Sequence, residues 1–350
     1  MLNTYLWQKQ LGQSKLPQHM EKLLKNSKKD KNHNPLIHPV IIFPYSNTKE
    51  NHIRELYSQL EANGVVEGNV YAKPITVVNN QTVFRNTRWG NEADKDWKKS
   101  HDEFLELREF IQKRSTIKDA WCVDTCQTWL AGFGTAYNPE GIGDVYWLIP
   151  GDFEYADLNS TTDVDKGRIF WEQLFKMPTL VAKGDYDLVL GEIKVPLNSS
   201  KQLIDTYGTY GLLYNWFPSE AQGIRKITDK PRTEFFAISH NYLEAVLRRR
   251  WYAYEQTIVI LLHGMRGKEA IRKIHKVDLG AITDHAQGRD SLSSAMQQVE
   301  RTERVLKLYW REYHEQLEDP SWRENFRQLD HQSQQIRTAA LVILEQILRK

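Results

Sequence analysis

The feature that most constrains this fold is an alternation of short apolar runs and amphipathic segments over about 200 residues. Apolar runs with the length and β-branched content of buried strands occur at 38–44, 75–78, 144–149 and 186–191. Between them, apolar residues recur at helical spacing in 48–63, 101–113 and 166–175. Strands that alternate with helices form a mostly parallel, doubly wound sheet. The sequence therefore predicts an α/β protein.

Beyond residue 290 the pattern becomes helical and strongly charged, with two predicted helices separated by Pro320. The first 35 residues are polar and rich in lysine, and we expect short helices there, outside the sheet. Three parts are predicted: an N-terminal helical extension at 1–35, a sheet domain at 36–290 and a C-terminal helical segment at 291–350. The C-terminal helices are expected either to cap the sheet or to form a homodimer with a second copy of the chain.

Composition excludes several classes of function. The net charge is only +2, which argues against nucleic acid as the main partner. No apolar run approaches the ~18 residues that a membrane-spanning helix needs, and the N-terminus lacks the apolar region of a signal peptide. The two cysteines, Cys122 and Cys126, do not have the spacing of a zinc or thioredoxin site. Reduced thiols fit a cytoplasmic location.

Polar residues follow the first two predicted strands, where a doubly wound sheet binds its ligands. Pro44, Tyr45 and Ser46 come after the first strand, and their backbone groups are candidates to contact a base or ribose. Asn79 and Asn80 follow the second strand, and their amides can read the imide edge of uracil. The alternative for each segment is an ordinary turn.

Gly151 and Asp152 come just after the third strand, so Gly151 is a candidate cofactor-binding residue and Asp152 places a carboxylate at a rigid strand end. A divalent cation held by hard oxygen ligands neutralises a diphosphate leaving group. Asp152 is therefore a candidate metal ligand and catalytic residue, with Glu154 and Asp157 close by in sequence. The alternative is that Asp152 only caps a helix.

Two later segments carry further candidate catalytic side chains. Arg232 can hold a phosphate or carboxylate in a bidentate fork, and Glu234 can accept hydrogen bonds from sugar hydroxyls. The alternative for this pair is a surface salt bridge. Glu255 precedes an apolar helix that runs to Leu262, and complementing the dipole of that helix is its alternative role.

A last predicted strand, 276–282, leads to Asp284 and His285. Histidine is a suitable second ligand for a catalytic divalent ion, and Asp284 either lies beside this ligand or is the ligand in its place. A purely structural histidine is the alternative. Arg289, just beyond, is a second basic candidate beside Arg232 for stabilising the leaving group.

The order of these segments resembles the GT-A glycosyltransferases, and within them glucosyl-3-phosphoglycerate synthase and its mannosylglycerate-forming relatives. That family has a Gly-Glu-Tyr-Ala-like segment where Thr233–Ala237 stands and a Gly-Tyr-Gly-x-Glu-like helix start where Tyr252–Glu255 stands. Its Asn/Asp-Leu-Gly-x-x-x-His strand corresponds to Asp278–Gly280 followed by His285. The resemblance covers about residues 38–310.

This resemblance implies that 36–290 is a nucleotide-sugar-binding catalytic domain. It implies a UDP- or GDP-type sugar donor, magnesium or manganese as cofactor, and retention of anomeric configuration. Asp152 and His285 would be the metal ligands, and Asn79 would lie near the base. Pro150 replaces the first carboxylate of the family's Asp-x-Asp triplet, and His285 comes one residue late, so Asp284 remains an alternative ligand. The acceptor is expected only to be a small hydroxylated molecule.

Three other functions compete with this interpretation. The replacement at Pro150 is compatible with a degenerate domain that binds or regulates without catalysis. A sugar-phosphate nucleotidyltransferase opens with a glycine-rich loop, and the turn after Phe43 contains no glycine. A scaffold built from the C-terminal helices is the third alternative.

Overall fold

The structure, a computed structural model, describes residues 35–43, 50–79, 97–120, 132–160, 164–194, 200–248, 257–266, 272–282, 292–315 and 320–348. The short helices predicted within 1–34 lie outside these residues.

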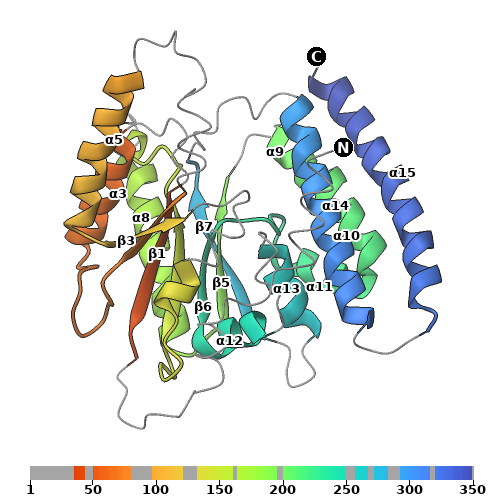
Figure 1. The fold of residues 1–350 in the computed structure, drawn as a ribbon, viewed down its shortest axis with the longest axis horizontal. Helices are drawn as coiled ribbons and strands as arrows, with labels where there is room; N and C mark the ends of the chain where they lie inside the picture. Colours follow the sequence, from red (N-terminus) through yellow and green to blue (C-terminus); the bar gives the residue numbers. More distant parts are fainter. Residues whose placement is uncertain are drawn as a thin grey trace.

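A seven-stranded sheet lies at the centre of the molecule (Figure 1). Its strands are β1 (Ile37–Phe43), β2 (Ile75–Asn79), β3 (Thr116–Ala120), β4 (Val145–Pro150), β5 (Leu188–Ile193), β6 (Phe235–Ser239) and β7 (Ile274–Gly280). They are arranged in the order β3-β2-β1-β4-β6-β5-β7. β6 runs antiparallel to both of its neighbours, and every other pair is parallel. The predicted α/β class with a mostly parallel sheet is confirmed.

The central strands are apolar on both faces because helices cover both faces. Along β1, Val40 and Ile42 belong to one buried cluster, whereas Ile41 and Phe43 belong to the other. This alternation follows from the two-residue period of a strand. It explains why the sequence shows a continuous apolar run here instead of an alternating one.

One face of the sheet is covered by α3 (Glu50–Ala62), α5 (Trp97–Gln112) and α8 (Val164–Ala182) (Figure 1). α3 ends at Ala62, and the predicted glycine cap, Gly64, follows with a φ of 73°, which favours glycine. α8 continues past the predicted end at residue 175, through Pro178. Burial of Met177 and Val181 accounts for this extension, because their packing outweighs the hydrogen bond that proline removes.

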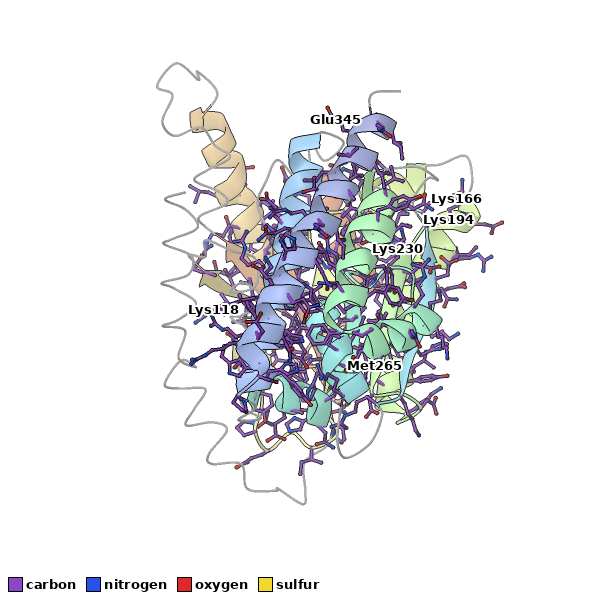
Figure 2. The ribbon with its side chains drawn as sticks, turned by 90° about the vertical axis from the view of Figure 1, so that its right-hand side faces the viewer. Lys118, Lys166, Lys194, Lys230, Met265 and Glu345 are labelled. Atoms are coloured by element: carbon purple, nitrogen blue, oxygen red, sulfur yellow. The ribbon has the colours of Figure 1, made fainter. Side chains whose placement is uncertain are left out.

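The other face carries a thicker helical layer (Figure 1). It contains α9 (Ser200–Leu203), the π-helix η1 (Ile204–Thr209), α10 (Tyr210–Trp216), α11 (Pro218–Ile227), α12 (His240–Arg248) and α13 (Thr257–Arg266). Two long helices follow on the outside, α14 (Leu292–Glu315) and α15 (Trp322–Leu348). Figure 2 shows this side, with α14, α15 and α10 running across the front.

The C-terminal helices cap this layer, one of the two arrangements that the sequence left open. Leu306 and Tyr309 of α14 lie in the same buried cluster as Val40 and Phe236 of the sheet, and Leu344 of α15 joins them. The predicted segment 291–350 therefore shares the main hydrophobic core. Among the described residues, no helix is both long and apolar enough to cross a membrane.

Candidate functional site

The carboxyl edge of the sheet brings together candidate residues that lie about 80 positions apart in sequence. β4 ends at this edge with Pro150, and Asp152 follows. Because β6 is antiparallel, its first residue starts at the same edge, with Phe236 opposite Leu148 and Phe235 opposite Gly191. Arg232 and Glu234, which directly precede β6, are thus on the same edge as Asp152.

Asp152 lies in a tightly fixed turn. The Gly151 amide donates to the carbonyl oxygen of Ile42 at 2.6 Å, and the Tyr155 hydroxyl donates to the Pro150 carbonyl. The side chain of Tyr155 is fully buried, whereas Asp152 keeps 7% of its surface exposed. The short helix α7 begins only at Asp157. The alternative role of Asp152 as a helix cap is therefore wrong.

A histidine that the sequence did not single out contacts this turn from α3. His52 is 1% exposed, and its Nδ1 accepts a hydrogen bond from the Ala156 amide at 3.1 Å. One ligand atom from each of His52, Glu154 and Asp157 lies within 4.8 Å of the others. A neutral imidazole that accepts at Nδ1 carries its proton on Nε2 and offers no lone pair there to a metal. The geometry thus favours a hydrogen-bonding role for His52.

The segment before β6 is tied to its surroundings on both sides. The Thr233 hydroxyl donates to the Gly191 carbonyl of β5, and the Thr257 hydroxyl of α13 donates to the Thr233 carbonyl. Arg232 donates through Nη2 to Oε1 of Gln298 on α14. Glu234 is half-buried. The C-terminal helices therefore help to position a candidate catalytic side chain, which the sequence alone did not indicate.

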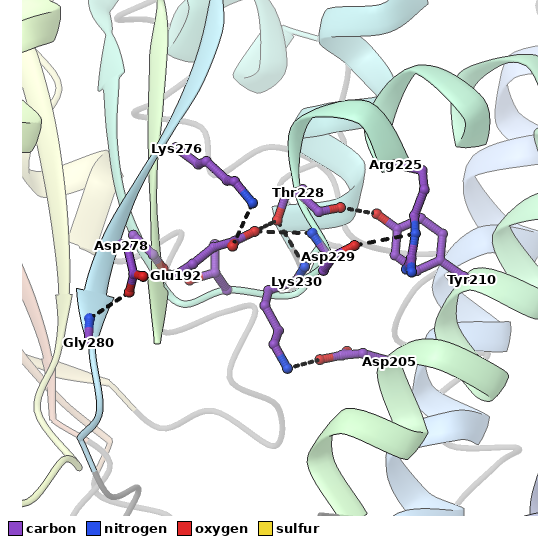
Figure 3. Close-up of polar contacts among 12 residues, drawn as sticks. Glu192, Asp205, Tyr210, Arg225, Thr228, Asp229, Lys230, Lys276, Asp278 and Gly280 are labelled. Carbon is purple, nitrogen blue, oxygen red and sulfur yellow. Dashed lines mark hydrogen bonds and ion pairs between the residues drawn. The ribbon is translucent and has the colours of Figure 1, made fainter. Parts of the chain in front are cut away.

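Glu192, near the end of β5, anchors the loop between α11 and β6 (Figure 3). Its carboxylate accepts from the Thr228 hydroxyl, from the Asp229 amide at 3.1 Å and from Nζ of Lys276 at 3.0 Å. These bonds satisfy both carboxylate oxygens and fix the loop to the sheet. Since the carboxylate meets a cation and two neutral donors, its charge is compensated locally.

The same loop carries a cation that sequence reasoning missed. Nζ of Lys230 lies 3.9 Å from Oδ2 of the buried Asp205, which belongs to the π-helix η1 (Figure 3). π-helical turns are frequent at functional sites. Lys230 stands two positions before Arg232, so a basic pair at 230 and 232 was the only signal in the sequence. Nothing in the sequence signalled Asp205, because its place beside Lys230 depends on how η1 packs against the loop.

The remaining predicted site residues lie away from Asp152 or outside the described part of the chain. Asn79 ends β2, which is separated from β4 by β1, and its backbone pairs with Ala120. The following predicted residues lie outside the described part of the chain: Pro44, Tyr45, Ser46, Asn80, Glu255, Asp284, His285 and Arg289. The helix predicted to open at Tyr252 is described from Thr257 onward, as α13.

No protein-family model matches this chain, and no curated protein matches it in sequence.

Proposed function

We propose that this protein is a metal-dependent glycosyltransferase that uses a UDP- or GDP-type nucleotide sugar. The observation that supports this most is that the segments carrying Asp152, Arg232 and Glu234 lie at the same carboxyl edge of a mostly parallel sheet. This is the edge where such sheets bind their ligands. It also fits the sheet type that the GT-A resemblance implies.

Asp152 fits a magnesium or manganese site. Magnesium is usually bound by one or two carboxylates together with substrate phosphates, so a single carboxylate at this strand end is sufficient. Pro150, where the family's first carboxylate would stand, therefore does not exclude a metal. A second protein ligand is proposed at His285 or Asp284. The bound metal would neutralise charge on the departing nucleoside diphosphate.

The chain's own residues then have separate tasks. Arg232 is proposed to stabilise the leaving group, and its hydrogen bond to Gln298 of α14 holds its guanidinium in place. Lys230, on the same fixed loop, has its charge compensated by the carboxylate of Asp205. Glu234 is proposed to orient hydroxyl groups of the sugar or of a small acceptor. The nucleotide base is proposed to bind beyond β1 and β2.

Thermal unfolding tests this proposal with UDP-, GDP- and ADP-sugars, each with and without magnesium or manganese. If one carboxylate holds the metal together with the diphosphate, stabilisation requires both ligands, and metal alone gives little. At a ligand concentration 100 times the dissociation constant, the gain is about 2.7 kcal/mol. Asp152→Asn keeps the shape of the side chain and removes its charge, so it should abolish the metal-dependent part and any turnover.

Asp165→Asn is the matched control, because Asp165 is an exposed carboxylate on α8. It should respond to the ligands like the wild type. A wild type that no nucleotide sugar stabilises would instead support a degenerate binding or regulatory domain. Full metal dependence in Asp152→Asn would show that the metal is held elsewhere.

A further inference from the structure

We propose that His52 is a positioning residue: its Nδ1 atom fixes the turn that carries Asp152. The effect of this contact on metal binding rests on the proposed function. His52 is buried at the start of α3, and it accepts a hydrogen bond from the Ala156 amide of the turn. The turn is 104 residues away in sequence, so this bond connects two separate elements.

The turn is short, and backbone hydrogen bonds within it couple the position of Ala156 to that of Asp152. The Tyr155 amide donates to the Phe153 carbonyl at 2.9 Å, and the Asp157 amide donates to the Glu154 carbonyl at 3.1 Å. Before Asp152, the Gly151 amide is bound to β1. Asp152 is thus held from both sides, by β1 through Gly151 and by α3 through His52. Residues that orient a metal ligand typically change metal affinity 10- to 100-fold when replaced.

The competing interpretation makes His52 itself a metal ligand with Glu154 and Asp157, whose ligand atoms lie within 4.8 Å of its own. That role needs a lone pair on Nε2 and a proton on Nδ1. The Ala156 amide, however, already directs its own proton at Nδ1, 3.1 Å away. Two N–H groups cannot hydrogen-bond to each other, so ligation would break the bond that the structure shows.

Two amide variants separate these roles. His52→Asn places a carbonyl oxygen close to the position of Nδ1, whereas His52→Gln places its amide close to Nε2. Gln fills the buried site better than Asn and is the better helix former. A defect confined to His52→Gln therefore cannot come from lost volume or from helix propensity.

Hydrogen–deuterium exchange at the Ala156 amide tests the contact without any ligand. We expect similar exchange in the wild type and His52→Asn, and exchange faster by about fivefold or more in His52→Gln, as the loss of one hydrogen bond predicts. The reverse order, equal defects in both variants, or no effect in either would overturn the positioning role.

Manganese affinity in the presence of UDP or of GDP, measured by electron paramagnetic resonance, tests the consequence at the site. His52→Asn should stay within about threefold of the wild type, and His52→Gln should bind at least about tenfold more weakly. Wild-type affinity in His52→Gln with a loss in His52→Asn would assign a ligand role through Nε2. If the wild type binds manganese with neither UDP nor GDP, the proposed function fails and so does this consequence, whereas the exchange result still decides the contact.

Discussion

Gly151 shows how one residue without a side chain builds the candidate site. A Cβ atom at this position would lie 2.8 Å from the carbonyl oxygen of Ile42, a backbone atom that cannot move aside. The missing side chain allows β1 to accept the Gly151 amide directly. Because Asp152 follows at once, the close approach of the two backbones sets where its carboxylate begins.

Gly151→Ala should therefore destabilise the protein by about 1–3 kcal/mol, the usual cost of overpacking. It should also weaken any metal-dependent nucleotide binding, since the turn must shift. Urea unfolding measures the first effect. Gly68→Ala is the control, because its added Cβ would meet only the Val66 carbonyl oxygen, at 3.9 Å. Equal unfolding midpoints for the two variants would contradict this account.

Among the elements, α3, β2 and the start of β3 are joined by a small buried hydroxyl cluster. The Tyr57 hydroxyl of α3 hydrogen-bonds to the Thr76 hydroxyl of β2, and the Thr76 and Ser115 hydroxyl oxygens lie 2.7 Å apart. Burial raises the pKa of Tyr57 to about 12, against an ordinary value of 10.0. The hydrogen bonds from Ser115 and Thr76 lower this pKa only in part.

This shift predicts how stability depends on pH. The unfolded tyrosine ionises near pH 10 and the folded one near 12, so the unfolded state binds fewer protons between these values. The contribution of Tyr57 is complete below pH 10 and is lost as pH rises toward 12, by about 2–3 kcal/mol. In Tyr57→Phe, urea unfolding across this range should show a decline smaller by that amount.

Tyr57→Phe also lowers the free energy of unfolding at neutral pH, by about 1 kcal/mol, because one hydrogen bond is missing. The decline with pH is therefore measured in each protein from its own value at neutral pH. Thr76 and Ser115 still bond to each other in this variant. Tyr214→Phe, which removes a hydroxyl from an exposed side chain, controls for the substitution itself. Parallel pH curves for the wild type and Tyr57→Phe would refute the role assigned to burial.

At the scale of the whole molecule, the C-terminal helices are joined to the rest by a shared core and a buried polar bridge. Trp216 of α10 donates to the Ser333 hydroxyl of α15, and Ser333 donates to Glu303 of α14 at 2.9 Å. Arg337 also donates to Glu303, at 2.8 Å. Nζ of Lys307 lies 2.8 Å from the same carboxylate, so two cations compensate the charge of Glu303, which is 2% exposed.

We therefore expect the chain to unfold as one unit. Leu344→Ala on α15, at a fully buried position, should cost about 2–5 kcal/mol and shift a single calorimetric transition of the whole protein. Val342→Ala, two residues away and 46% exposed, should change stability little. A separate transition for the C-terminal helices, affected alone by Leu344→Ala, would show that they form an independent unit.

Local periodicity predicted most of the elements because strands and helices leave their spacing in the sequence. The strand at 144–149 is β4 within one residue, and Pro320 separates α14 from α15 as expected. Two strands, β3 and β6, were not predicted, and other errors lie at boundaries, such as 186–191 for β5, which spans Leu188–Ile193. The extension of α8 beyond residue 175 was missed because burial of its far end outweighs a proline that locally predicts a stop.

The sequence by itself determined the α/β class and the position of Asp152 after a buried strand, because both follow from residues adjacent in the chain. Only the tertiary structure decided that β6 runs antiparallel and so brings Arg232 and Glu234 to the same edge. It alone placed His52 against the Ala156 amide and Glu192 against the loop before β6. These contacts join distant segments, and their geometry is set by how the layers pack, which no local pattern records.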